Sequence, residues 1–146
     1  MEKAIQLDII TPQGTVFSDK VVAVTLPGSL APFQVLYNHA PILSTLESGI
    51  LKVILPDLAS RYYVIGEGFV EVLHNHATVL VERIVPAEEI DPEAAAARLR
   101  QARAQVEMAR TRQELQKARR ELHEAEIAFR AARLARQLVG EGERMS

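Results

Sequence analysis

The sequence predicts an α+β protein in which an antiparallel β-sandwich or flattened barrel precedes a hairpin of two antiparallel helices. Three observations predict this. Residues 1–86 alternate apolar and polar side chains between turn-forming residues. Residues 93–139 form a run of 47 residues without Gly or Pro, with thirteen Ala and ten Arg. The apolar residues of that run follow two helical stripes. We expect a sandwich domain over residues 1–87 and a helical domain over residues 88–146.

Short candidate strands fill the first part of the chain. Apolar alternation and β-branched or aromatic composition mark six of them, at residues 5–9, 22–26, 51–55, 61–65, 69–73 and 77–85. Turn-forming residues separate them at 11–14, 27–29, 47–49, 56–57 and 74–76. Strands at this spacing are typical of antiparallel sandwiches and barrels, and about 85 residues can bury a modest core.

Two apolar seams run along the predicted arm. The first consists of Ala95, Leu99, Ala102, Val106 and Ala109, and the second of Leu115, Ala118, Leu122, Ala125, Phe129 and Ala132. Continuing the first seam leads to Gln113 instead of Leu115, and a slip of two residues turns the stripe by about 200°. A break between Val106 and Arg112 lets both seams face each other in a hairpin.

The ends and the stability of the arm also follow from composition. Pro92 is expected to open the helical run and Gly140 to close it. Alanine-rich seams bury little apolar area, so the helices should form readily but dock weakly. Because neither Gly nor Pro forces the break, an extended arm is also expected to be accessible. The arm is then a switch with two resting places, or, as the alternative, a permanent brace for the body.

Charge is distributed unevenly along the chain. The formal net charge is −2, but residues 1–90 carry −5 and residues 91–146 carry +3. This pattern favours docking of the basic arm on an acidic surface, with a solvated helix face as the alternative. Nucleic-acid binding is disfavoured, because the whole chain is acidic and no aromatic residues alternate with the arginines.

The sequence contains no catalytic constellation. The lack of Cys excludes disulfides and thiolate metal sites. His74 and His76 could share a strand face and bind a metal, but an exposed hairpin tip at Asn75 is the alternative that the turn residues favour. We find no signal-peptide pattern and no apolar run long enough to span a membrane, so any membrane association is expected to be peripheral.

Several short motifs follow one another in a characteristic order. They are Leu7 to Pro12 with Val16-Phe17, Leu26-Pro27-Gly28-Ser29, Phe33 to Leu43 with the turn Asn38-His39-Ala40-Pro41, Leu46 to Gly49, Gly66 to Val72, and Ile90-Asp91. Together they resemble the epsilon subunit of F-type ATP synthases, which is called delta in mitochondria. The resemblance covers nearly the whole chain, and it depends on the order of the motifs.

The resemblance implies a ten-stranded sandwich followed by a two-helix hairpin. It implies a non-catalytic central-stalk subunit that links the gamma subunit to the c-ring and couples proton flow to ATP synthesis. The arm would inhibit ATP hydrolysis by extending to the alpha and beta subunits. The implied location is the cytoplasmic face of the bacterial plasma membrane, reached only through the complex. No cofactor or metal is expected.

The resemblance also implies two sets of contact residues. Those expected to meet gamma or the c-ring are Ser29, Leu30, Ala31, Pro32, Phe33, Tyr37 and His39. Relatives usually carry a small polar or acidic residue where this chain has Ala31-Pro32, so we expect an apolar contact there. His39 is interpreted as a turn residue before Pro41, with proton transfer as the alternative. The arginines expected to pair with acidic surfaces are Arg110, Arg112, Arg119, Arg120, Arg130, Arg133 and Arg136.

Many relatives bind ATP in the hairpin through a pattern Ile/Leu-Asp-x-x-Arg-Ala. This chain has Ile90 and Asp91, but Ala94 stands at the arginine position. Without that guanidinium a phosphate loses its nearest fixed cation. Arg98 and Arg130 could substitute for it, so we expect millimolar ATP binding or none.

One alternative function remains from the sequence. A β-sandwich adaptor or chaperone with a coiled-coil interaction arm would have the same composition and the same periodicity.

Overall fold

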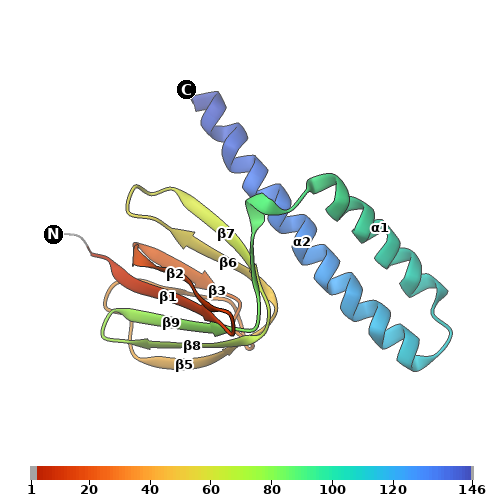
Figure 1. The fold of residues 1–146 in the computed structure, drawn as a ribbon, viewed down its shortest axis with the longest axis horizontal. Coiled ribbons are helices and arrows are strands. Elements are labelled where there is room, and N and C mark those ends of the chain that lie inside the picture. The colour runs from red at the N-terminus through yellow and green to blue at the C-terminus, as the bar shows by residue number, and fades with distance from the viewer. Residues whose placement is uncertain (1–2, 146) are drawn as a thin grey trace. The chain divides into compact units, whose positions relative to one another are not determined.

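A computed structural model describes the backbone of residues 3–145 and the side chains of residues 3–137. It divides into two compact units, Met1–Val85 and Pro86–Ser146. The first is a ten-stranded β-sandwich, and the second holds a short 3-10 helix and two packed α-helices (Figure 1). The predicted fold class is therefore confirmed.

The ten strands form two sheets of five. Sheet 1 has the order β2-β1-β9-β8-β5 and sheet 2 the order β10-β7-β6-β3-β4. The strands are β1 (Ile5–Thr11), β2 (Gly14–Val21), β3 (Ala23–Leu26), β4 (Phe33–Val35), β5 (Ile42–Leu46), β6 (Gly49–Ile54), β7 (Ser60–Ile65), β8 (Gly68–Leu73), β9 (His76–Val81) and β10 (Ile84–Pro86).

The core lies between the two sheets. Alternate residues of each strand point to one face, so every second side chain of β1 and β6 enters it. Ile5, Leu7 and Ile9 are fully buried, as the alternation predicts. Leu51 and Val53 supply the same layer from sheet 2. The large buried side chains of the core are Ile5, Leu7, Ile9, Leu26, Leu51 and Ile65, with Val21, Val24, Val35, Val53, Val70 and Val72.

Three details of the sandwich differ from what the sequence predicts. The first residue of the predicted strand 22–26, Val22, is half-buried, whereas Val21 just before it is fully buried. The segment 77–85 is not one strand, because the chain leaves sheet 1 after Val81 and enters sheet 2 at Ile84. β1 and β9 pair in parallel, while β1–β2, β3–β4, β3–β6, β5–β8, β6–β7 and β8–β9 pair antiparallel. Strands so far apart in sequence are free to pair in either direction.

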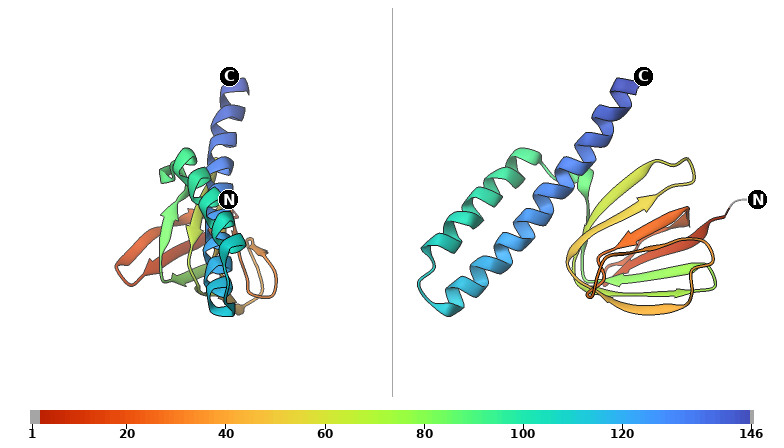
Figure 2. Two further views of the ribbon diagram at one scale, coloured as in Figure 1. Left: turned by 90° about the vertical axis from the view of Figure 1, so that its right-hand side faces the viewer. Right: turned by 180° about the vertical axis from the view of Figure 1, so that it is seen from behind.

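The second unit contains η1 (Ala87–Glu89), α1 (Pro92–Met108) and α2 (Arg112–Met145). Pro92 is the first residue of α1, as expected, and the Asp91 side chain caps the helix by accepting from the N–H of Glu93 at 3.0 Å. The two helices run antiparallel and side by side (Figures 1 and 2). The break at residues 109–111 lies inside the interval that the seams predict.

The seams meet as the slip of two residues predicts. Leu99 and Ala102 of α1 are buried together with Ala125 of α2, and Leu122 and Phe129 pack against them. Ile127 and Ala131 are also buried although they lie outside the second seam. η1 packs against α2 as a further element of this unit.

The expectation that Gly140 closes the helix is wrong, because α2 continues to Met145. Gly inside a helix costs only about 1 kcal/mol relative to Ala, so Gly140 and Gly142 weaken the helix without ending it, and Glu141, Glu143 and Arg144 beside them are good helix formers. Neither α1 nor α2 is apolar enough over its described length to cross a bilayer.

Candidate functional site

The loop residues expected to contact a partner lie at two opposite ends of the sandwich. Ser29 lies beside the end of β5, because its N–H donates to the carbonyl of Thr45 at 3.1 Å. His39 precedes the start of β5, where the N–H of Asn38 donates to Asn75 Oδ1 at 2.6 Å. The strand between them has five residues, which span about 17 Å. The two loops therefore lie about one strand length apart, at the two ends of β5.

We name the loop 29–32 the Leu30 end. Leu30 is fully exposed, and Ala31 and Pro32 are exposed beside it. The loop is anchored on both sides, since Thr45 Oγ1 donates to Ser29 Oγ at 2.9 Å and Phe33 packs against the core. This end therefore presents an uncharged, apolar tip on a fixed base.

We name the loop 36–41 the His39 end. Tyr37 is exposed and His39 half-buried, with its Nδ1 2.6 Å from the carbonyl of Ala40. Asn38 and Asn75 both have positive φ, and Asn75 Nδ2 donates to Asn38 Oδ1 at 3.3 Å. The imidazole thus contacts the backbone of its own turn, as the interpretation of His39 as a turn residue expects.

The outer face of sheet 1 carries apolar side chains that the alternating pattern did not single out. Ile10 pairs with Leu80 on β9, and Leu80 pairs with Phe69 on β8. Phe69 is 50% exposed and Leu80 42%, and Leu43 on β5 is 74% exposed in the next row. We call these four residues the apolar face. Ile10, Phe69 and Leu80 line one hollow on three adjacent strands, and Leu43 lies diagonally beyond Phe69, whose direct partner on β5 is Thr45.

Acidic residues lie at the border of the apolar face. Glu67 and Glu82 line the shallow hollow that Ile10, Phe69 and Leu80 form. Both glutamates are exposed. A partner for this surface therefore needs an apolar stripe with basic residues beside it.

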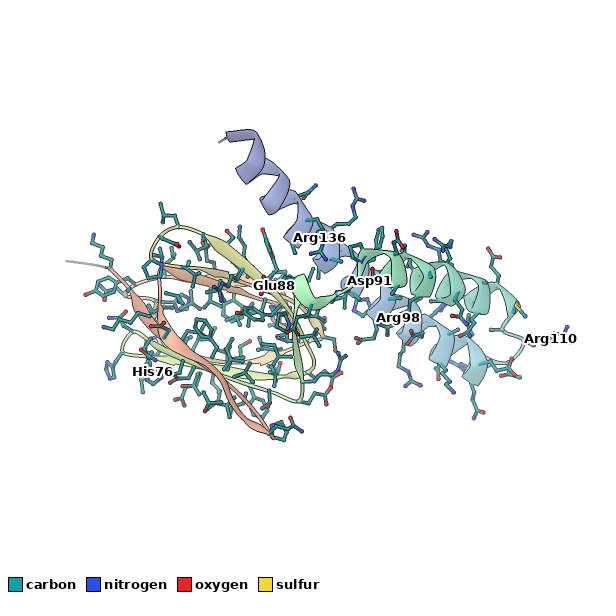
Figure 3. The ribbon with its side chains drawn as sticks, turned by 45° about the horizontal axis from the view of Figure 1, so that its top comes forward. His76, Glu88, Asp91, Arg98, Arg110 and Arg136 are labelled. Atoms are coloured by element: carbon teal, nitrogen blue, oxygen red, sulfur yellow. The ribbon has the colours of Figure 1, made fainter. Side chains whose placement is uncertain are left out.

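A polar quartet occupies the same outer face nearer the start of β1. Asp8 accepts hydrogen bonds from Ser18 Oγ, from Gln6 Nε2 at 3.1 Å, and from His76 Nε2. Figure 3 labels His76. These bonds, with that of Ser18 the largest influence and His76 next, hold the pKa of Asp8 below its usual value of 3.8.

The quartet has the residue types of a nucleophilic triad but a different arrangement. A triad needs the imidazole between serine and aspartate. Here the serine hydroxyl and the imidazole both contact the carboxylate. Among the described residues no group of three or more His, Cys, Asp or Glu could hold a metal. His76 bonds Asp8, and His74 and Asn75 have the positive φ of a tight turn.

Three of the four residues expected to bind nucleotide already have partners within the hairpin. Asp91 caps α1, and the carbonyl of Ile90 accepts from Arg136 Nη2 at 3.4 Å. Arg98 donates from Nε to Glu121 Oε1 at 2.7 Å and from Nη2 to Oε2 at 3.2 Å (Figure 3). This hydrogen bonding lowers the pKa of Glu121 and raises that of Arg98. Arg130 is exposed on α2.

The arginines expected to pair with acidic surfaces are exposed along the second unit. Arg110 lies in the turn between the helices, and Arg112 begins α2. Arg133 lies over the ring of Phe129, with its guanidinium carbon 5.7 Å from the ring centroid. These positions leave the charged groups at the surface, although Arg136 also contacts Ile90.

The sandwich matches one protein family over almost its full length. The family model described as "ATP synthase, Delta/Epsilon chain, beta-sandwich domain" covers residues 4–87. The chain belongs to the ATP synthase delta/epsilon family. It is therefore a non-catalytic subunit of that enzyme, and the resemblance predicted from the ordered motifs is confirmed.

Individual delta/epsilon relatives agree with this assignment. The ATP synthase epsilon chain of a Nitratiruptor species is 39% identical over 99 residues, which is 68% of this chain and 77% of that protein. The epsilon chain of Lawsonia intracellularis is 39% identical over 105 residues, 71% of this chain and 77% of the relative.

A solved structure of the Euglena gracilis mitochondrial ATP synthase, comprising OSCP, F1 and the c-ring, contains a chain of similar fold. The TM-score is 0.75 at 26% sequence identity, covering 92% of this chain and 82% of that one. The similarity therefore extends beyond the sandwich into the helical unit.

Two residues that shape the turn of the helical unit escaped the sequence analysis. Thr111 and Glu114 shape the break between the helices, which no Gly or Pro explains. The signal was present as the capping-box pattern Thr-x-x-Glu at residues 111–114. The apolar face had no such signal, because strand composition alone does not tell an outward apolar residue from an inward one.

Proposed function

We propose that this chain is a central-stalk subunit of an F-type ATP synthase, which links the gamma subunit to the c-ring and couples proton flow to ATP synthesis. Membership of the delta/epsilon family supports the assignment of this chain to an ATP synthase. Because the curated relatives are bacterial, the complex is assigned to the cytoplasmic face of a bacterial plasma membrane. Family membership also favours this function over an unrelated adaptor or chaperone.

The apolar face is the observation that carries the assignment to gamma. Phe69, Leu80 and Leu43 are between 42% and 74% exposed on adjacent strands. Contiguous apolar surface rimmed by polar residues is a mark of protein–protein contact. A strand-built surface is also rigid, so a rotating partner bound to it transmits torque without loss through loop motion.

The Leu30 end is assigned to the c-ring. Leu30, Ala31 and Pro32 project from a loop whose two sides are held by Ser29 and Phe33. Pro32 restricts the backbone there, which lowers the entropy lost on binding. Tyr37 and His39 lie at the other end of β5, so this assignment does not depend on them.

The arm is assigned the regulatory role. Its exposed arginines suit acidic surfaces of the alpha and beta subunits or of gamma, with a brake on hydrolysis as the result. We expect ATP to exert little control, because we expect it to bind with millimolar affinity or not at all. Nucleotide binding would compete with the Arg98–Glu121 pair and with the Asp91 cap.

Co-purification with the gamma subunit tests the proposal. We expect the chain to bind gamma of its own organism, and Leu80→Lys to weaken that binding about tenfold or more, because it places a charge at the centre of the apolar face. Leu58→Lys is the matched control. Leu58 is 72% exposed but lies in the loop between β6 and β7, outside the apolar face.

Binding is measured by titration of gamma against each variant after circular dichroism has confirmed the fold. Equal loss of affinity in Leu58→Lys would mean that the apolar face is not part of the interface with gamma. Failure of the unaltered chain to bind gamma would contradict the function itself.

A further inference from the structure

The turn between α1 and α2 is held by a reciprocal set of hydrogen bonds. The Glu114 carboxylate accepts from the N–H of Arg110 at 2.9 Å and from the N–H of Thr111 at 3.4 Å. In return, the N–H of Glu114 donates to Thr111 Oγ1 at 3.0 Å. This is a capping box, in which the first and fourth residues satisfy each other's backbone.

We propose that Thr111 and Glu114 form a latch that keeps the arm folded as a hairpin and sets how often it straightens. This deepens the regulatory role proposed for the arm, and its biological meaning rests on that role. The latch replaces the Gly or Pro that usually ends a helix at such a turn. Its geometry depends on residues 109–111 remaining outside the helix.

Straightening the arm destroys every bond of the latch. Ala109 has φ −65° and ψ 132°, which is extended backbone. In a continuous helix the N–H groups of Arg110 and Thr111 would bond carbonyls four residues earlier. The Glu114 carboxylate and the Thr111 hydroxyl would then lose their partners, so these two side chains stabilise the bent arm relative to the straight one.

The latch can affect the folded state because the contacts between the helices are modest. The seam is built mainly from alanine, with Leu99, Leu122 and Phe129 as its larger side chains. The ion pair Arg98–Glu121, which we call the clasp, also joins the helices, and both of its side chains are more than 40% exposed. Solvent screens such a pair strongly. A cap at the turn is therefore comparable in strength to the clasp that it supplements.

The clasp and the latch act together. Arg98 and Glu121 are 23 residues apart, which on a straight helix is about 35 Å. The pair can form only when the turn is closed. The latch holds the turn, which lowers the loss of backbone entropy when the clasp and the seam form.

The rate of thiol labelling at Ala102→Cys measures opening of the seam. Ala102 is 2% exposed between the helices, and the chain has no other Cys. In this background we expect Thr111→Ala with Glu114→Ala to raise the labelling rate of the full chain about tenfold, because two capping partners are lost. Gln113→Ala with Glu107→Ala is the matched control, since both residues are exposed.

Two results would overturn the latch. One is a labelling rate in the Thr111/Glu114 variant within twofold of the control. The other is a rise in labelling accompanied by a fall in helical circular dichroism, which would mean that the helices unravel instead of straightening. Retained or increased helix content with faster labelling supports the proposal. Binding to gamma is measured separately, so failure of the latch and failure of the proposed function are distinguishable.

Discussion

At the scale of single residues, Asp8 is the most informative side chain of the sandwich. It is held by three side chains from β1, β2 and β9. It therefore links β1 both to its antiparallel neighbour β2 and to its parallel neighbour β9. Hydrogen bonds to the ionised carboxylate are what keep the pKa of Asp8 low. The quartet therefore stabilises the sheet only while Asp8 is charged.

Stability should depend on pH through this carboxylate. Its folded-state pKa lies below the unfolded value, so its contribution is complete above about pH 4 and is lost as the pH falls through the folded-state pKa. We expect Asp8→Asn to destabilise the chain by about 0.5–1 kcal/mol at pH 7, because solvent partly screens the site. The difference between the two proteins should close near pH 2, as measured by urea unfolding.

Glu71→Gln serves as the control for Asp8→Asn. Glu71 is exposed on the same sheet, and its replacement should change stability by less than about 0.5 kcal/mol. If the gap between Asp8→Asn and the unaltered chain stayed constant down to pH 2, a packing effect would explain it and the charge would not.

At the scale of elements, the pairing of β8 and β9 depends on Gly68. Gly68 pairs with Val81. A Cβ at this position would collide with the carbonyl oxygen of Leu80 and lie 2.9 Å from its carbonyl carbon. Since the obstacle is backbone, relief requires a shift of the strand itself. The tight pairing here also holds Phe69 and Leu80 next to each other on the apolar face.

Gly68→Ala should therefore destabilise the chain by about 3 kcal/mol, the upper range for overpacking, because β8 and β9 must separate. Urea unfolding of the full chain measures it. Glu67→Ala, in the same turn but exposed, should stay within about 0.5 kcal/mol of the unaltered chain. Similar stability of the two variants would mean that the pairing of β8 with β9 adjusts at little cost in free energy.

At the scale of the whole molecule, the sandwich and the helical unit have separate cores. Leu7, Leu51 and Val70 belong to one, and Leu99, Ala102 and Ala125 to the other. A chain built in this way can lose or move its arm while the sandwich keeps its own packing. Substitutions in the helical unit can therefore leave the core of the sandwich unchanged.

Deleting the chain after Glu89 separates the two roles within an assembled ATP synthase. If the arm is a brake, the deletion should raise ATP hydrolysis severalfold while gamma stays bound through the sandwich. Hydrolysis by the purified complex gives the readout, and the gamma content of the same preparation is the control. Unchanged hydrolysis would identify the arm as a brace.

Local patterns in the sequence predicted much of the architecture. The alternation of Ile5, Leu7 and Ile9 identified the buried face of β1, and the two-residue slip between the seams predicted a turn before Arg112. Both depend on the period of side chains along one element, which a sequence displays directly. The ordered motifs, through resemblance to known epsilon subunits, supplied the ten strands and the family. β2 escaped detection because both of its faces are largely exposed and show no alternation.

Tertiary structure alone decided which separated residues meet. It paired β1 with β9 in parallel, placed the Leu30 and His39 ends at opposite ends of the sandwich, and joined Arg98 to Glu121. It also aligned Phe69 and Leu80 into one apolar face. The physical reason is that strand order and register result from packing a shared core, in which all strands compete for neighbours at once. No single segment carries that information.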